Sequence, residues 1–245
     1  MPKTKMTINR PSRTERGSVL IYIFIAVIAL TALMFAFARG GRESMSTVDR
    51  ETSELMATQM LDYVGMIRRS IQSMRVDGVA DTSLCFDDNG WTHNDYDYAA
   101  CSNTNNQVFG AEGGAAVFQK PDIRLFNSDF QAQSAYWTWQ FTGANAIIGV
   151  GSDGAGADSS DLVMALPYLR RAVCESINRR LQIPNPTTIP VDDPDFDVTT
   201  RFTGSYTAGE TLNAAGINGF RSGCFQADNT PATGAYVFYA VLVSR

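Results

Sequence analysis

Few residues in this sequence have the types and spacing that enzyme chemistry needs. His93 is the single histidine, so a Ser-His-Asp or Cys-His site would have to use it. It lies among Asn and Asp residues, with no nucleophile motif beside it. The chain also lacks the Gly-Lys-Ser/Thr signature of a phosphate-binding loop. We therefore predict that the protein is not an enzyme.

Carboxylates gather in three loops, where they could bind calcium. Calcium takes about six to eight oxygen ligands, and closely spaced Asp side chains supply several of them. The first candidates are Asp192, Asp193, Asp195 and Asp197. Two further groups are Asp87, Asp88, Asn89, Asp95 and Asp97, and Asp153, Asp158 and Asp161. None matches the EF-hand spacing. A solvated loop remains the alternative for each group, and calcium is the one cofactor to consider.

The four cysteines predict two disulfides. Their even number in a loop-rich region is typical of a protein from an oxidising compartment. Four cysteines allow three pairings, and we favour Cys85–Cys101 and Cys174–Cys224. Each bridge would add about 3–4 kcal/mol by the loop-entropy argument. No Cys-x-x-Cys motif occurs, which disfavours zinc.

The cysteines follow a segment without charges. Residues 18–38 contain no charged residue, Asn, Gln, Gly or Pro. As a helix these 21 residues would span about 30 Å, the thickness of a bilayer's hydrocarbon core. We therefore expect a transmembrane helix; a buried core helix and a cleaved secretory signal are the alternatives. Residues 1–17 hold five basic residues and one acidic residue, which places the N-terminus in the cytoplasm.

The junction before this segment resembles the leader of type IV prepilins. Glu15-Arg16-Gly17-Ser18 is followed directly by Val19, Leu20 and Ile21. The resemblance implies that a prepilin peptidase cuts between Gly17 and Ser18, and that Ser18 is then methylated. It also implies that the apolar segment becomes the first half of a long helix. Calcium stabilises several pseudopilins, so by analogy the resemblance slightly favours the Asp192–Asp197 group.

Tyr22 departs from the pattern of that family, because most pilins have a Glu at this position. The departure favours a minor or tip subunit, which needs no charge pair with a neighbour above it. The expected partners are other pilin or pseudopilin subunits, contacted through the N-terminal helix, together with the prepilin peptidase and the inner membrane. A permanently anchored periplasmic binding module with no filament role is the alternative.

Apolar residues from Met45 to Met74 recur mostly every three or four positions, which predicts an amphipathic helix. The following region, up to residue 116, is loop-rich. Its aromatic residues Trp91, Tyr96 and Tyr98 either stack on a sugar, contact a partner or pack under the Cys85–Cys101 loop. We expect strands at residues 122–126, 136–142 and 146–150, a helix at 167–181, and a central strand at 236–243, which is apolar on both faces.

Together these elements predict an α+β fold. A pilin-like long N-terminal helix, with a transmembrane half and an amphipathic half, would precede an antiparallel-sheet domain. The expected parts are a cytoplasmic leader (1–17), a transmembrane helix (18–38), a helical stalk (39–76) and a periplasmic domain (77–245). The chain has a net charge of −5, and without the leader −9, so we expect no nucleic-acid partner. The predicted function is that of a minor pilin or pseudopilin-like subunit of a type IV pilus or a type II secretion pseudopilus.

Overall fold

The structure is a computed structural model that describes residues 18–87, 96–152, 159–184, 189–192, 195–207 and 209–245; the side chains of residues 18–20, 32–48 and 192 lie outside the description. Contacts divide the chain into two compact units, residues 1–49 and residues 50–245. Helix α1, Ser18–Val76, contributes residues to both units. Each unit is described by itself.

In the first unit, the described part of α1 carries large apolar side chains in solvent. No helix within the described residues combines enough length with enough apolar character to cross a membrane. This finding overturns the predicted transmembrane helix over residues 18–38. It also overturns the predicted single-pass location in an inner membrane, with a cytoplasmic N-terminus and a periplasmic domain. The described apolar side chains, at residues 21–31, cover only about 16 Å of helix, half of a bilayer core.

In the second unit, residues 50–76 of α1 bury one face in the core. The buried side chains recur at helical spacing and are Met56, Met60, Tyr63, Val64, Ile67, Ile71 and Met74. Each such side chain stabilises the fold by about 1.5–3 kcal/mol when it leaves water. Leu55, on the other face, is exposed. The amphipathic pattern therefore correctly predicts which face of this part of α1 is buried.

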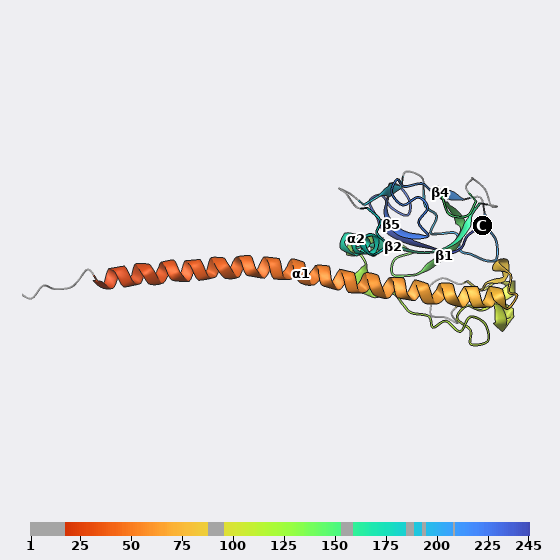
Figure 1. Ribbon diagram of the computed structural model, residues 1–245, viewed down its shortest axis with the longest axis horizontal. Coiled ribbons are helices and arrows are strands. Elements are labelled where there is room, and N and C mark those ends of the chain that lie inside the picture. The colour runs from red at the N-terminus through yellow and green to blue at the C-terminus, as the bar shows by residue number, and fades with distance from the viewer. Residues whose placement is uncertain (1–17, 88–95, 153–158, 185–188, 193–194, 208) are drawn as a thin grey trace, which may run out of the picture. The chain divides into compact units, whose positions relative to one another are not determined.

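Six strands form one sheet in the order β3-β5-β6-β2-β1-β4. Figure 1 labels β1, β2, β4 and β5 of this sheet. Their bounds are β1 Gln140–Ile147, β2 Asp161–Leu169, β3 Val191–Asp192, β4 Glu210–Leu212, β5 Ser222–Ala227 and β6 Tyr236–Val243. The four inner strands are antiparallel, whereas β3 pairs with β5, and β4 with β1, in parallel. Strand β6 lies between β2 and β5, as its two apolar faces predict.

The predicted α+β fold is thus wrong in two respects, its transmembrane half and its antiparallel sheet. The sheet is mixed because β3 and β4 come from long irregular segments that return to the two sheet edges alongside β5 and β1. The predicted strand at 122–126 is a 3-10 turn instead, and β1 begins at Gln140 and ends at Ile147. The 3-10 helices are Asp81–Ser83, Ala99–Ser102, Thr104–Asn106, Ile123–Leu125 and Ser128–Phe130.

Helix α2 is Arg171–Arg180 and starts four residues later than predicted. Pro167 belongs to β2, because this strand continues along β6 as far as Leu169. Proline has no N–H for a strand ladder. Accordingly, Pro167 lies where the β2–β6 register shifts, between Leu166 and Leu169.

Two disulfides tie the second unit together. Cys85 is bonded to Cys101, and Cys174 to Cys224, which are the pairings that the sequence favours. The first bridge joins two cysteines that are 16 positions apart in the chain, and the second joins α2 to β5. Disulfides of this kind are typical of proteins from oxidising compartments.

Candidate functional site

The predicted leader junction lies at the start of the described chain. Gly17 is outside the described residues, and Ser18 is the first residue of α1. Cleavage and methylation at this position therefore stay predictions.

His93 and Trp91 also lie outside the described residues. Tyr96, by contrast, is fully buried, and its hydroxyl accepts a hydrogen bond from the Phe141 backbone N–H at 2.9 Å.

The calcium candidates are only partly described. Asp193 and the side chain of Asp192 lie outside the description. Asp195 Oδ1 accepts a hydrogen bond from Asn229 Nδ2 at 2.8 Å. Within the described part of the chain, no group of three or more His, Cys, Asp or Glu side chains is placed to hold a metal ion. The calcium site stays a prediction.

Asp197 has a structural use in this loop. Its Oδ1 accepts hydrogen bonds from the Thr199 and Thr200 backbone N–H groups, at 2.7 and 2.9 Å, and from the Thr199 hydroxyl at 2.9 Å. Burial alone would raise the pKa of Asp197, but the hydrogen bonds from Thr200 and Thr199 outweigh it and lower the pKa. The carboxylate thus caps a turn.

In the third candidate group, Asp161 also has a structural use. Its two carboxylate oxygens accept the backbone N–H groups of Ile147 and Arg245, both at 3.1 Å. The other two members of this group, Asp153 and Asp158, lie outside the described residues.

A glycine motif follows β1. Residues 149–154 read Gly-Val-Gly-Ser-Asp-Gly, which matches Gly-x-Gly-x-x-Gly. In dinucleotide-binding proteins this motif joins a strand to a helix and then to a parallel strand. Here β1 is followed by β2, which is antiparallel to it. The topology therefore argues against a dinucleotide site.

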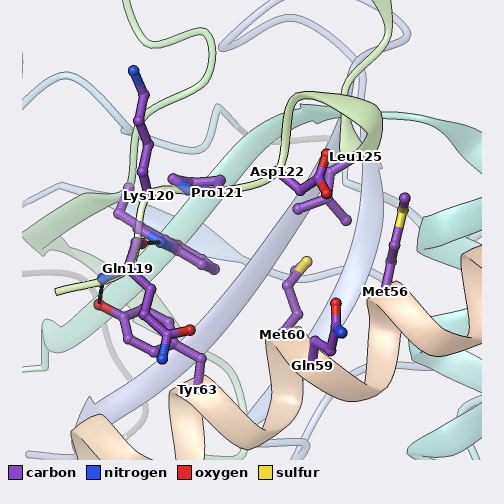
Figure 2. A pocket seen from close by; sticks show the side chains of 10 residues that line it. Met56, Gln59, Met60, Tyr63, Gln119, Lys120, Pro121, Asp122 and Leu125 are labelled. Carbon is purple, nitrogen blue, oxygen red and sulfur yellow. Dashed lines mark hydrogen bonds between the residues drawn. The ribbon is translucent and has the colours of Figure 1, made fainter. Parts of the chain in front are cut away.

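A small pocket of about 120 Å³ lies between α1 and an irregular segment of the second unit (Figure 2). Met56, Gln59, Met60 and Tyr63 come from α1 at helical spacing. Residues 119–122 and Leu125 face them, and Trp139 completes the lining. The sequence does not mark this pocket, because its two sides are about sixty residues apart in the chain.

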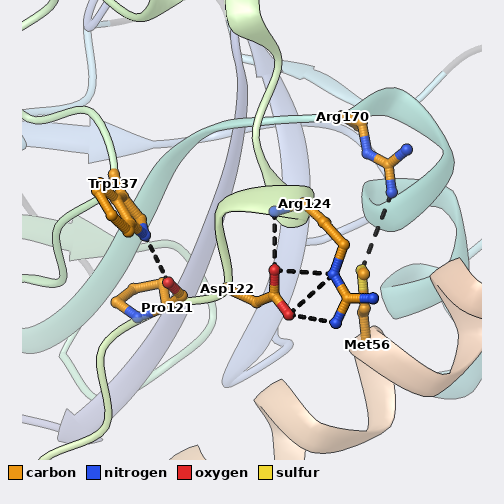
Figure 3. Close-up of polar contacts among 6 residues, drawn as sticks. All are labelled: Met56, Pro121, Asp122, Arg124, Trp137 and Arg170. Carbon is orange, nitrogen blue, oxygen red and sulfur yellow. Dashed lines mark hydrogen bonds and ion pairs between the residues drawn. The ribbon is translucent and has the colours of Figure 1, made fainter.

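Hydrogen bonds with aromatic side chains hold the backbone of residues 119–121 in place. Tyr63 Oη accepts the Gln119 N–H at 3.2 Å, and Trp139 Nε1 donates to the Gln119 carbonyl at 3.0 Å (Figure 2). Trp137 Nε1 donates to the Pro121 carbonyl at 2.6 Å (Figure 3). Lys120 Nζ lies 3.5 Å from the centre of the Trp137 ring, a cation–π contact. The segment is therefore held rigidly beside α1.

Asp122, which lines the pocket, is paired with Arg124 (Figure 3). Arg124 Nε and Nη2 both donate to Asp122, with a shortest distance of 2.5 Å. This hydrogen-bonded guanidinium lowers the pKa of Asp122 and keeps the carboxylate ionised. Arg170 Nη2 contacts Met56 Sδ at 3.9 Å, and its buried Nε has no partner among the described residues. Because Asp122 is ionised and already paired with Arg124, it is a poor general base.

The first unit presents a different candidate, an apolar surface on α1. Eight large apolar side chains between Ile21 and Leu30 are 54–70% exposed: Ile21, Tyr22, Ile23, Phe24, Ile25, Val27, Ile28 and Leu30. Soluble monomers rarely expose contiguous apolar area of this kind, and such surfaces mark interaction sites. This surface is the stronger candidate for function.

Comparison with known proteins does not identify a relative. No protein-family model matches the sequence. No curated protein and no solved structure shows significant similarity to the chain.

Proposed function

We propose that this protein is a structural subunit of the minor pilin or pseudopilin type, which assembles with other subunits through the N-terminal part of α1. The filament would be a type IV pilus or a type II secretion pseudopilus. The observation that carries the proposal is the exposed apolar surface between Ile21 and Leu30. The leader-like junction at Gly17 and Ser18 supports it independently.

The distribution of this surface favours several helical neighbours over one flat partner. Successive residues of a helix are rotated by about 100°. Ile21, Tyr22, Ile23, Phe24 and Ile25 are consecutive and all exposed, so apolar side chains face every direction around the axis. A helix that is apolar all round has to be enclosed. The packed N-terminal helices of neighbouring subunits would enclose it.

The free energy gained by burying this surface is large enough to support assembly. Burying eight side chains from their present exposure of 54–70% contributes roughly 7–15 kcal/mol. Association costs about 4–15 kcal/mol in lost translational and rotational freedom. The Ile21–Leu30 surface alone therefore offsets most or all of that cost, before any contact made by the second unit.

The alternative is a binding module without a filament role. The small pocket between α1 and residues 119–125 gives it little support. Pockets that bind drug-sized molecules usually have volumes of about 300–1,000 Å³. The pocket beside Met56 has only about 120 Å³. It resembles a packing gap between α1 and the 119–125 segment.

Leader processing tests the proposal. The full chain, expressed together with a prepilin peptidase, should be recovered with Ser18 as its N-terminal residue, as read by mass spectrometry of the intact protein. A Gly17→Leu variant is the matched control and should keep the leader, because a bulky side chain would block the peptidase. Recovery of the unaltered chain only with Met1 or Pro2 at its N-terminus would contradict the proposal.

A further inference from the structure

A second pocket of the residue 50–245 unit has a volume of about 400 Å³ and is lined by three arginines. Arg68 and Arg75 come from α1, where a spacing of seven residues places them two turns apart on one face. Arg221 directly precedes β5. Gln72 and Ser244 add polar groups to the lining, so the pocket is polar and strongly positive.

Arg68 is fixed within this pocket by neutral acceptors. Its Nε donates to the Val241 carbonyl at 2.8 Å, and its Nη2 donates to the Arg221 carbonyl and to Ser222 Oγ, both at 2.7 Å. Burial, and then the nearby charge of Arg221, lower the pKa of Arg68 to about 10. Arg68 therefore stays charged at neutral pH but has no carboxylate beside it among the described residues.

Among the residues that the structure describes, the other two arginines have no counter-charge either. In the described part of the chain, no hydrogen bond or ion pair reaches the side chain of Arg75 or Arg221. Asp81 pairs with Arg245, which does not line the pocket, at 3.8 Å. Residues 50–245 contain twenty-two acidic and thirteen basic residues. Three positive charges thus lie together with no carboxylate paired to them among the described residues.

We propose that this pocket binds a small multivalent oxyanion of the phosphate or polycarboxylate class. Guanidinium groups donate paired N–H groups whose geometry matches carboxylate and phosphate oxygens. A bound anion would neutralise the repulsion between Arg68 and Arg221 and would occupy the free donors of Arg75 and Arg221. The volume falls within the usual range for small-molecule sites. This site is independent of the filament proposal.

Binding of inorganic phosphate and of citrate to the full chain tests the proposal, by isothermal titration calorimetry at pH 7 and constant ionic strength. The two anions distinguish phosphoryl from carboxylate recognition. Arg75→Gln and Arg221→Gln should each weaken binding about tenfold, the size of one charge-assisted hydrogen bond. Both side chains are exposed, so their replacement should leave the fold intact.

Arg69→Gln is the matched control. Arg69 is an exposed arginine of the same helix that does not line the pocket, so the variant changes net charge equally. It should bind the preferred anion within about twofold of the unaltered protein. The proposal is overturned if neither anion binds below about 10 mM, or if Arg69→Gln weakens binding as much as the pocket variants. Arg68 is left unaltered because its three hydrogen bonds hold α1 to the sheet.

Discussion

At the residue scale, Tyr98 shows how one hydroxyl stabilises an irregular region. Its Oη donates to the Leu84 carbonyl at 2.8 Å, with a longer contact to the Thr82 carbonyl at 3.2 Å. Leu84 directly precedes Cys85, so the hydroxyl and the Cys85–Cys101 bridge hold the same turn. Burial raises the pKa of Tyr98 to about 12, because the phenolate would lose its hydration there.

Tyr98 should make stability depend on alkaline pH. Its folded pKa lies above the value of about 10 of an unfolded tyrosine. The folded state therefore keeps a proton that the unfolded state releases. This contribution to stability is complete below pH 10 and is lost as the pH rises towards 12. In Tyr98→Phe, the free energy of unfolding should be about 1 kcal/mol lower at pH 8 and should fall less steeply above pH 10.

Urea unfolding at pH 8, 10 and 11, followed by circular dichroism, measures this difference. Tyr22→Phe changes an exposed hydroxyl of α1 and should match the unaltered protein at each pH. If the curves of free energy against pH for Tyr98→Phe and the unaltered protein run parallel, Tyr98 does not ionise differently in the two states.

At the element scale, α2 is held to the sheet by a disulfide and by one buried amide. Asn178 Nδ2 donates to the Cys224 carbonyl, and Asn178 Oδ1 accepts the Cys224 N–H, both at 2.8 Å. Asn178 is fully buried one turn after Cys174. The side chain therefore completes the hydrogen bonding of β5 on the side that faces α2, as a neighbouring strand would.

Replacing Asn178 with Ala should strongly destabilise the second unit. The change leaves the buried N–H and carbonyl of Cys224 without partners, at about 1–3 kcal/mol for each group. We expect the free energy of unfolding, measured by urea titration with both disulfides intact, to fall by about 3 kcal/mol.

Asn218→Ala is the control for this change, because Asn218 makes an exposed hydrogen bond to Asn213. It should cost less than about 0.5 kcal/mol. If Asn178→Ala lowered the free energy of unfolding as little as Asn218→Ala does, the disulfide alone would hold α2 to the sheet.

The sequence predicts an element well when the apolar residues of that element alone show which of its faces are buried. Residues 50–76 of α1 and strand β6 are of this kind, because each shows its buried faces in its own residues. Residues 122–126 mislead because they are apolar enough for a strand, whereas the Asp122 and Asn127 side chains accept local N–H groups and favour turns. The parallel edges formed by β3 and β4, and both pockets, depend on pairings between distant segments, which no local pattern encodes.

At the scale of the whole molecule, the proposed function assigns contact with other subunits to the first unit, whereas the buried core belongs to the second. The described apolar side chains of residues 21–31 are exposed, and the core lies within residues 50–245. A change in the first unit should therefore alter assembly without altering the stability of the second.

Phe24→Asp should reduce self-association of the full chain, because a charge in an apolar helix bundle is unfavourable unless it is paired. Phe24 is 62% exposed, and Leu55, in the second unit, is 59% exposed. Sedimentation velocity should show smaller assemblies for Phe24→Asp, and unchanged assemblies for the control Leu55→Asp. Equal behaviour of the two variants would place the assembly surface elsewhere. The urea midpoint of the second unit should stay the same in Phe24→Asp.

The hydrogen bond from Arg68 to Val241 has a consequence for biosynthesis, since 173 residues separate the two partners. Ribosomes add about 5–20 residues per second, so roughly 10–35 s pass between the synthesis of the two residues. During that time the apolar face of residues 50–76 has no β6 to cover it. Native contacts between such distant residues also slow folding. Arg68 can therefore form this native contact only after nearly all of the second unit has been synthesised.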